Sequence, residues 1–599
     1  MAFQVDFEPI GRRVAVEPDT TLLEAAQHAG VLLTAICGGE GSCGHCIVRV
    51  MRGSVSPPTR TEEAELGRDK IAAGWRLACQ TTLSGDLHIH VPPDSLATAQ
   101  RTQTEGQAIP VELAPAVRAF DLRIAPPTLD DLRSDAARTR DAVERADWSF
   151  DHGVLRKLSN DLREAEFQVS VLTRGREIIG VRPAGTRPLG LAVDVGTTKL
   201  AAYLVDLASG ETLAALGAMN PQIAFGEDVM ARIHHALSRP EGAEQLRTAI
   251  VEALNGLARD LCAQVGHPVA DIADAVVVGN TAMHHLFLGL PVRQLGMAPY
   301  VPAESAALDV KARDVGLDLA PGAYVHLLPN VAGFVGADHL AMLLATGVAE
   351  RDDVVLAMDI GTNTEVSLRA RGKHFACSTA SGPAFEGAHI RFGMRAAPGA
   401  IERVSIRGDK VHFQTVGNEP PVGLCGSGIL DLIAQLRHSG LISERGAFLA
   451  NAPNAHVRRG AQGFEFILTS GAENDGREIT FDRKDITEIQ LAKGAMRAGV
   501  NILLKHAGVT EAEIDELIIA GAFGTYLDVQ SGLDIGMFPP VARERIRQVG
   551  NAAGAGARMA LLSLAERARA VRIAQQIQYV ELTSEPDFQG EFAHALMIG

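Results

Sequence analysis

Four cysteines near the N-terminus constrain the fold of this chain more than any other feature of its sequence. Cys37, Cys43 and Cys46 share one glycine-rich loop, and Cys79 follows after a further, partly helical stretch. Four thiolates complete the two irons of a 2Fe–2S cluster, and glycines let the backbone pass close to its sulfurs. A four-cysteine zinc site usually shows two similar Cys-x2-Cys pairs, whereas Cys79 stands alone. The spacing therefore predicts an iron–sulfur cluster on these four cysteines.

The residues around these cysteines predict a small domain of short strands around one helix. Residues 3–7 and 13–16 alternate like a hairpin, residues 20–29 form a helix behind a threonine cap, and residues 87–91 form a last strand. The segment 2–95 closely resembles ferredoxins of the plant and adrenodoxin type, above all in the five residues between Cys37 and Cys43. The resemblance implies a β-grasp ferredoxin domain over residues 1–96 that carries one 2Fe–2S cluster.

The remaining sequence divides into three parts, because 599 residues are too many for one core. Residues 97–109 are rich in Thr, Gln and Gly and are predicted to be a flexible linker. Residues 110–187 are predicted to form a small α+β domain with helices over 130–146 and 154–165. Nothing there indicates chemistry, and we interpret it as a spacer or docking module. Residues 188–599 alternate strands and helices as α/β proteins do.

Composition narrows the function classes. The net charge is −16 and no basic arm or stripe is visible, so nucleic acid is not an expected partner. No stretch of 18 consecutive apolar residues indicates a membrane span. Seven cysteines is an odd number and four of them lie in the first 80 residues, which favours a metal site in a reducing compartment over a disulfide framework and predicts a cytoplasmic protein. Cys262, Cys377 and Cys425 are predicted to be small buried hydrophobic residues.

One internal repeat organises the long C-terminal part. Leu191–Lys199 recurs as Leu356–Thr364, and Asp274–Gly279 recurs further on as Asp515–Gly521. Two landmarks that recur in the same order predict two related subdomains that face one another. The second copy carries a long insertion between its landmarks.

Each copy of the repeat places a carboxylate near the end of an apolar strand. Asp194 precedes Gly196-Thr197-Thr198, and Asp359 precedes Gly361-Thr362-Asn363. A buried carboxylate is costly unless a cation accompanies it, and hydrated Mg²⁺ is the obvious candidate. The amides and hydroxyls of the two turns can grip phosphate oxygens. Since the chain contains no Gly-x4-Gly-Lys-Ser/Thr motif, the site is not a P-loop.

These motifs resemble the phosphate-1 and phosphate-2 loops of the superfamily of acetate kinase, sugar kinases, heat-shock chaperones and actin. The resemblance implies a duplicated, ribonuclease-H-like, actin-type ATPase domain with ATP and Mg²⁺ between two subdomains, and it makes Asp194 and Asp359 the residues that orient Mg²⁺ or water. Gly521 and Ala522 look like part of the adenosine loop. The segment 279–281 occupies the matching place in the first subdomain, where an ordinary strand-to-helix turn is an equal alternative.

Two further segments leave alternatives open. Glu386, in Ser381–Gly387, could lie near the water that attacks ATP, but this segment could equally be a packed loop. The segment 426–428 opens an apolar helix, and it could bind an anion or simply begin the helix.

The whole chain resembles the reductive activators of corrinoid-dependent enzymes. The motifs that carry this resemblance are the ferredoxin cysteines, Asp194-Val-Gly-Thr-Thr, Val278–His285, Asn330–Gly336 and Asp359–Glu365. It implies ATP-dependent transfer of one electron to an inactive Co(II) corrinoid on a partner corrinoid protein or cobalamin-dependent methyltransferase, which restores Co(I). It also implies an ATPase domain that dimerises and docks that partner, and an upstream donor such as a flavoprotein or ferredoxin reductase.

Three other functions remain open from the sequence alone. A small-molecule kinase with an accessory ferredoxin predicts a substrate that accelerates ATP turnover. A redox- and nucleotide-sensing module predicts binding without a reduced product. An ATP-driven activator of another low-potential metalloenzyme differs from a corrinoid activator only in the protein that accepts the electron. The sequence does not settle whether ATP hydrolysis or only ATP binding drives transfer.

Overall fold

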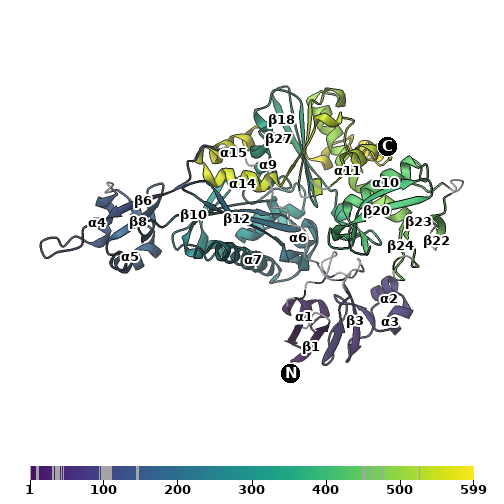
Figure 1. Cartoon of the computed structure of the whole chain (residues 1–599), viewed down its shortest axis with the longest axis horizontal. Coiled ribbons are helices and arrows are strands. Elements are labelled where there is room, and N and C mark those ends of the chain that lie inside the picture. The colour runs from purple at the N-terminus through teal and green to yellow at the C-terminus, as the bar shows by residue number, and fades with distance from the viewer. Residues whose placement is uncertain are drawn as a thin grey trace.

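The computed structural model describes most of the chain and shows its parts as separate bodies around a large two-lobed core (Figure 1). The described residues are 2–8, 12–29, 31, 33, 39, 41, 44, 46–92, 95, 111–143, 147–449, 454–460, 463–472, 474, 476–521, 523–524 and 527–599. Cys37, Cys43, Ala522 and the predicted linker lie outside them.

The N-terminal domain is a mixed five-stranded sheet packed on one helix, in the order β2-β1-β5-β3-β4. The antiparallel β1–β2 hairpin and the helix α1 behind its Thr21 cap confirm the sequence predictions. β1 also pairs in parallel with the last strand, β5, as a β-grasp fold requires. The elements are β1 (Phe3–Glu8), β2 (Arg12–Val16), α1 (Leu22–His28), β3 (Ile47–Arg52), α2 (Arg60–Leu66), α3 (Arg68–Ala72), β4 (Trp75–Leu77) and β5 (Leu87–His90).

The small α+β domain lies at the far side of the molecule from the ferredoxin domain (Figure 1). Its four strands are ordered β6-β8-β9-β7, and two helices cover them. The elements are β6 (Val117–Arg123), α4 (Asp135–Ala142), β7 (Ser149–Phe150), α5 (His152–Glu164), β8 (Gln168–Arg174) and β9 (Glu177–Pro183).

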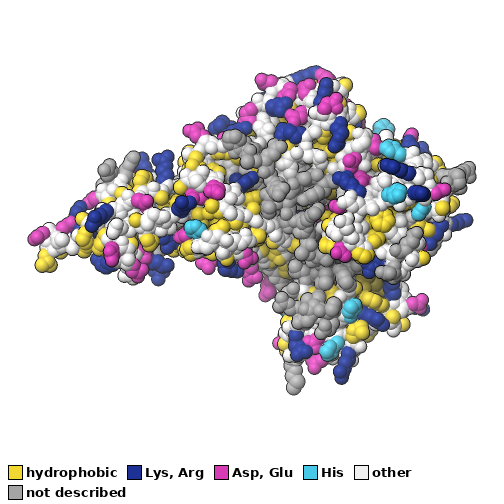
Figure 2. Space-filling view, viewed as in Figure 1, with side chains coloured by type: hydrophobic (Ala, Val, Ile, Leu, Met, Phe, Trp, Pro, Cys, Tyr) yellow, Lys and Arg dark blue, Asp and Glu magenta, His cyan; other side chains and the backbone are white. Residues whose placement is uncertain are grey.

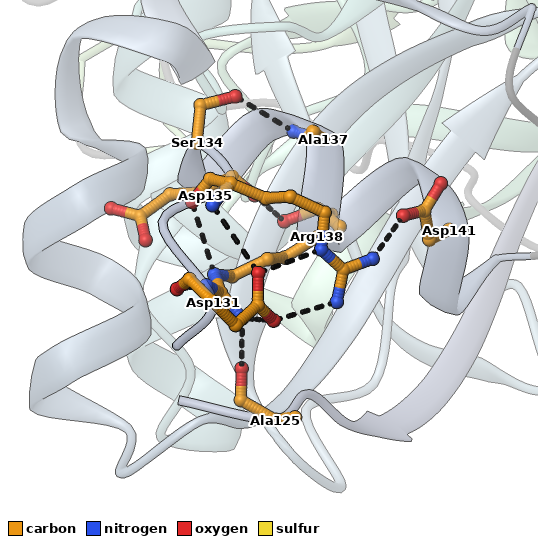
Figure 3. Close-up of polar contacts among 9 residues, drawn as sticks. Ala125, Asp131, Ser134, Asp135, Ala137, Arg138 and Asp141 are labelled. Atoms are coloured by element: carbon orange, nitrogen blue, oxygen red, sulfur yellow. Dashed lines mark hydrogen bonds and ion pairs between the residues drawn. The ribbon is translucent and has the colours of Figure 1, made fainter. Parts of the chain in front are cut away.

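The first helix of this domain begins later than the sequence predicted. We expected a helix from residue 130, but Ser134 caps α4 by accepting a hydrogen bond from the Ala137 amide at 3.2 Å (Figure 3). The preceding turn is held instead by Asp131, which accepts a hydrogen bond from Arg138 Nη1 at 2.7 Å. Asp and Ser compete with helical hydrogen bonds through their own side chains, which is why the helix starts after them.

The two halves of the large domain share the topology of five strands, which confirms the duplication, and they differ in the sixth: β14 lies beyond β15, whereas β27 lies at the opposite edge, beside β18. In the first sheet the order is β12-β11-β10-β13-β15-β14, and in the second it is β26-β25-β16-β17-β18-β27. In both, the first strand of the repeat pairs antiparallel with the next strand and parallel with the second landmark strand. The strands are β10 (Leu189–Val195), β11 (Lys199–Asp206), β12 (Thr212–Met219), β13 (Ile272–Gly279), β14 (Leu308–Lys311), β15 (Tyr324–Leu327), β16 (Val355–Ile360), β17 (Thr364–Ala370), β18 (Lys373–Thr379), β25 (Glu516–Ala520), β26 (Ile546–Gly550) and β27 (Ile577–Tyr579).

Helices bury both sheets and join the two lobes. A shared apolar core contains side chains of both sheets together with those of α9 and α14, so these two helices form the seam between the lobes. The first lobe also holds α6 (Val229–Ser238), α7 (Gly242–Val265) and α8 (Thr281–Leu288), and the seam helices are α9 (Ala337–Thr346) and α14 (Ala552–Leu562). The second lobe holds α11 (Arg483–Ala507), α13 (Val529–Asp534), α15 (Leu564–Gln576) and α16 (Phe588–Ala595).

The predicted insertion forms a separate part of the second lobe. It contains α10 (Gly426–His438) and two three-stranded sheets, β20-β19-β21 and β22-β23-β24. Their strands are β19 (Ala400–Arg407), β20 (Lys410–Thr415), β21 (Gly423–Leu424), β22 (Val457–Gly460), β23 (Gly463–Thr469) and β24 (Ile479–Asp482).

The surface mixes charges of both signs. Figure 2 shows acidic and basic side chains interspersed over the face that it presents. Within the described part of the chain, no helix is both long and apolar enough to cross a membrane. Cys262, Cys377 and Cys425 are all buried, as predicted.

Candidate nucleotide cleft and cluster site

The two predicted phosphate loops meet between the lobes. Loop 1 (196–198) is the turn from β10 to β11, and loop 2 (361–363) is the turn from β16 to β17. The hydroxyls of Thr198 and Thr362 lie 3.1 Å apart, although 164 residues separate them in sequence. This contact confirms that the two repeats face one another.

A single cavity collects the predicted nucleotide residues. Side chains of both lobes line it, and they include the rings of Phe385 and Phe523, which stack with centroids 5.2 Å apart. The predicted residues that line it are Asp194, Gly196, Thr197, Thr198, Asp359, Gly361, Thr362, Asn363, Glu386 and Gly521. The lining thus offers partners of different kinds, polar groups for phosphates and aromatic rings for a base.

Four carboxylates line this cavity, of which Glu365 is buried and Asp194, Asp338 and Asp359 are half-buried. Burial, together with the nearby charges of Asp338 and Asp359, raises the pKa of Asp194 to about 8. Burial likewise raises the pKa of Asp359 to about 7 and that of Asp338 to about 6, and it raises the pKa of Glu365 strongly. Among the described residues, no Lys or Arg forms an ion pair with any of the four.

This arrangement fits a hydrated cation. The described residues contain no cluster of three or more side chains placed to ligate a metal directly. Mg²⁺ commonly keeps several waters and takes only one or two carboxylates together with phosphate oxygens. Asp194 and Asp359 would hold such an ion, which would lower the pKa of both and neutralise phosphate charge.

Two of these four acids were missed by the sequence analysis. Asp338 lies in the first turn of α9, and Glu365 lies on β17 directly after loop 2. Glu365 is the last residue of the motif Asp359–Glu365, which supports the family resemblance. Asp338 comes two residues after another such motif, Asn330–Gly336. A carboxylate at the first turn of an apolar helix was the available signal.

Loop 1 is held from several sides. Asn280, which caps α8, donates a hydrogen bond from Nδ2 to Thr197 Oγ1 at 2.9 Å. The fully buried Arg232 of α6 donates to the Thr197 carbonyl and, at 2.8 Å, to that of Gly226. The turn at 279–281 therefore serves both as a helix cap and as a support for loop 1.

Gly521 abuts the second loop. Its φ is +91°, and a Cβ there would lie 2.4 Å from the Ile360 carbonyl oxygen and 3.0 Å from Asp359 Oδ1. Only glycine combines this conformation with this approach. The segment predicted to hold adenosine therefore lies against the carboxylate predicted to orient the metal.

The described part of the cluster site fits an iron–sulfur cluster. Cys46 and Cys79 are buried in one core, and the Ala78 amide donates to the Cys46 carbonyl at 2.8 Å. A Cβ on Gly39 would lie 4.0 Å from the Cβ of Cys79. Gly39 therefore lies next to Cys79, although the two are far apart in sequence. Gly39, Gly41 and Gly44 all have positive φ. Thiolates are the ligands that iron–sulfur clusters take.

Fold and site together define an ATP-binding protein of the actin and sugar-kinase type with a ferredoxin domain attached. The family model for 2Fe–2S cluster-binding domains matches residues 5–84. Models for the linker region, the middle region and the C-terminal ASKHA domain of RACo match residues 106–188, 189–351 and 353–599. The chain belongs to the RACo family.

Similar proteins span the whole chain. It is 32% identical over 608 residues to the corrinoid activation enzyme RamQ of Eubacterium limosum, covering 100% of this chain and 99% of RamQ. It is 26% identical over 419 residues to the reductase of the Co(II) methylated amine-specific corrinoid protein of Methanosarcina barkeri, covering 65% and 72%. The solved structure of a reductive activator for corrinoid, iron-sulfur protein shares 37% identity, with a TM-score of 0.73 and coverage of 100% and 98%.

Proposed function

We propose that this protein is an ATP-dependent reductive activator that passes one electron to the Co(II) corrinoid of a partner protein and restores Co(I). The observation that carries the proposal is the union, on one chain, of a ferredoxin domain and a two-loop ATP cleft, in a family whose full-length relatives are named corrinoid activators. We place the protein in the cytoplasm, where thiols stay reduced.

The chemistry explains why the two parts would be joined. A plant-type cluster has a potential near about −400 mV, and each ~59 mV of uphill one-electron transfer reduces the equilibrium yield about tenfold. ATP binding can offset such a gap only by favouring one conformation of the protein or of its complex over another. The polar linker predicted over residues 97–109 would let the ferredoxin domain move between donor and acceptor.

We propose the following roles. Cys37, Cys43, Cys46 and Cys79 hold the cluster, which stores one electron when bound. Asp194 and Asp359 orient Mg²⁺ or water, with Asp338 and Glu365 beside them. Loop 1 and loop 2 bind phosphates through their amides and hydroxyls, and Gly521 and Ala522 flank the adenosine. The upstream donor is a flavoprotein or ferredoxin reductase, and the ATPase domain forms a homodimer.

The test is the appearance of Co(I). The reduced protein is mixed under anaerobic conditions with Co(II)-loaded corrinoid proteins from the same cell, and the Co(I) absorbance is followed with and without Mg-ATP. We expect Co(I) only with ATP, loss of the signal in Asp359→Ala, and no loss in the control Asp352→Ala, whose side chain is exposed.

Other outcomes would point to other functions. No Co(I) with any candidate, despite an intact cluster and bound ATP, would contradict the proposal. A small molecule that accelerates ATP turnover would then favour a kinase, and binding without a reduced product would favour a sensor.

A further inference from the structure

Glu386 sits where the two loops come together. Its Oε1 atom accepts hydrogen bonds from Thr362 Oγ1 at 2.7 Å and from Thr198 Oγ1 at 3.1 Å. One carboxylate oxygen is therefore held by one hydroxyl from each lobe, and both threonines are buried. These are the hydroxyls that the loops would offer to a phosphate oxygen.

Cations surround the same carboxylate. Arg395 Nε lies 3.9 Å from Glu386 Oε2, and the same guanidinium bonds to Glu227 of the first lobe. Lys199, the residue after loop 1, also lines the cavity, and the Glu386 carboxylate acts to raise its pKa against the lowering effect of burial. The Glu386 carboxylate thus has two hydroxyls and two cationic side chains near it. A terminal phosphate would be bound by groups of the same kinds.

The segment that carries Glu386 is short and bracketed by glycines. Glu386 ends a 3-10 helix, η7 (Pro383–Glu386), between Gly382 and Gly387, both at positive φ. Nothing lies within 4 Å of the position that a Cβ would take at Gly382, so the chain has open space on that side. Gly387, by contrast, packs against Met394, and the three residues before Glu386 are buried. Displacement of the carboxylate therefore requires rotation of the partly exposed Glu386 side chain rather than movement of the whole turn.

We propose that the Glu386 carboxylate occupies the seat of the nucleotide's terminal phosphate, and that ATP displaces it and is then held there by Thr198, Thr362, Lys199 and Arg395. This assignment rests on the proposed ATP site and deepens it. A carboxylate and a phosphate carry charge of the same sign and cannot occupy one position together, so Glu386 competes with ATP. Without nucleotide, the Glu386 carboxylate joins the two loops by accepting hydrogen bonds from Thr198 and Thr362.

The test is the affinity of the holoprotein for the non-hydrolysable analogue AMPPNP with Mg²⁺, measured by titration calorimetry. Glu386→Gln keeps the size of the side chain and removes the competing charge, so we expect the Kd to fall about tenfold, which is about 1.4 kcal/mol. The Kd for AMP, which lacks the terminal phosphate, stays within twofold. The control Glu544→Gln, at an exposed site, changes neither.

A second variant tests the seat from the side of the cations. Lys199→Met should weaken AMPPNP binding about tenfold or more and leave AMP binding unchanged, with the cluster absorbance intact as a check of folding. An unchanged AMPPNP Kd in Glu386→Gln, together with slower ATP hydrolysis, would overturn the inference and make Glu386 a group that acts on water. Failure of the wild-type protein to bind AMPPNP would instead overturn the ATP site itself.

Discussion

The four acids of the cleft show how burial sets the chemistry of single residues. Asp194, Asp338, Asp359 and Glu365 line one cleft, and none of them forms an ion pair with a described residue, so each binds its proton more tightly than an exposed acid does. A cation that enters the cleft must displace those protons. Binding of Mg-ATP is therefore expected to release protons at neutral pH and to tighten as the pH rises from about 6 to 8.

This titration also makes the stability of the nucleotide-free protein depend on pH. Asp194 keeps its proton in the folded state up to a pKa of about 8 but loses it near 3.8 when unfolded. Between these values the folded state binds more protons, so the free energy of unfolding falls as the pH rises. In scanning calorimetry from pH 6.5 to 8.5, we expect the unfolding temperature of the wild type to fall about 2–4 °C further than that of Asp194→Asn.

The comparison with Asp194→Asn isolates this one group, because all other titrating residues are common to both proteins. Parallel curves for the two proteins would mean that Asp194 is ionised in the free cleft. Saturating Mg-ATP should remove the difference between their slopes, since the cation replaces the proton.

At the scale of elements, the sequence predicts what is local and repeated. The strands that contain Asp194 and Asp359 are apolar runs followed by turn residues. The sequence therefore predicts both strands and the two loops that follow them. The start of α4 was wrong because the Asp131 contacts that hold the turn come from residues several positions away. Asp338 has only a weak local signal, a carboxylate in the first turn of an apolar helix, and it was missed because its role depends on α9 lying at the seam between the lobes.

The element η2 (Pro221–Phe225) is another structure that only tertiary contacts define. Asn220, which caps it, donates from Nδ2 to the Gly196 carbonyl at 2.8 Å and from its amide to the Thr198 carbonyl at 2.9 Å. At the other end of η2, the Ala224 carbonyl accepts a hydrogen bond from Gln27 of the ferredoxin domain at 2.9 Å. One short helix thus contacts both loop 1 and the electron-carrying domain.

We expect Asn220→Ala to weaken Mg-ATP binding about fivefold to thirtyfold, because a buried hydrogen-bond partner of loop 1 is lost. Asn255→Ala is the matched control. Asn255 also donates to one carbonyl, that of Gly316 at 2.9 Å, and accepts from one amide, that of Asp318, but it lies on α7 away from the cleft. Titration calorimetry measures the Kd of each variant for Mg-AMPPNP. Equal changes in Kd for the two substitutions would show that the contact between Asn220 and loop 1 does not support nucleotide binding.

At the scale of the whole molecule, the ferredoxin domain rests on the first lobe with its cluster side turned inward. Cys79 and Gly39 line a hollow of about 840 Å³ whose opposite wall comes from η2, α6 and α7. Between the described residues of the two domains, the polar contacts across this boundary are the Gln27 hydrogen bond and an ion pair between Glu24 and Arg239 at 3.1 Å. A corrinoid partner must reach the cluster, so a weak and releasable contact here suits an electron shuttle.

The ion pair predicts how the docked arrangement responds to charge and salt. Glu24 and Arg239 are half-exposed, so their attraction contributes at most about 1 kcal/mol and is screened by salt. Raising the ionic strength should therefore release the wild-type ferredoxin domain and increase the radius of gyration measured by small-angle X-ray scattering. In Arg239→Glu the introduced carboxylate repels Glu24, so the domain is released at low salt, about twofold to fivefold more than in the wild type, and added salt brings it back.

The opposite sign of the two salt effects distinguishes this contact from a general loosening of the molecule. Arg259→Glu makes the same charge change at an exposed position on the same lobe, and it should follow the wild type. If Arg239→Glu responds to salt as Arg259→Glu does, the ion pair does not hold the domain. If its response to salt is reversed, the Glu24–Arg239 ion pair helps to set the position of the cluster. The domain boundary that contains this ion pair also contains η2, which contacts loop 1, so nucleotide binding at loop 1 could change the position of the ferredoxin domain.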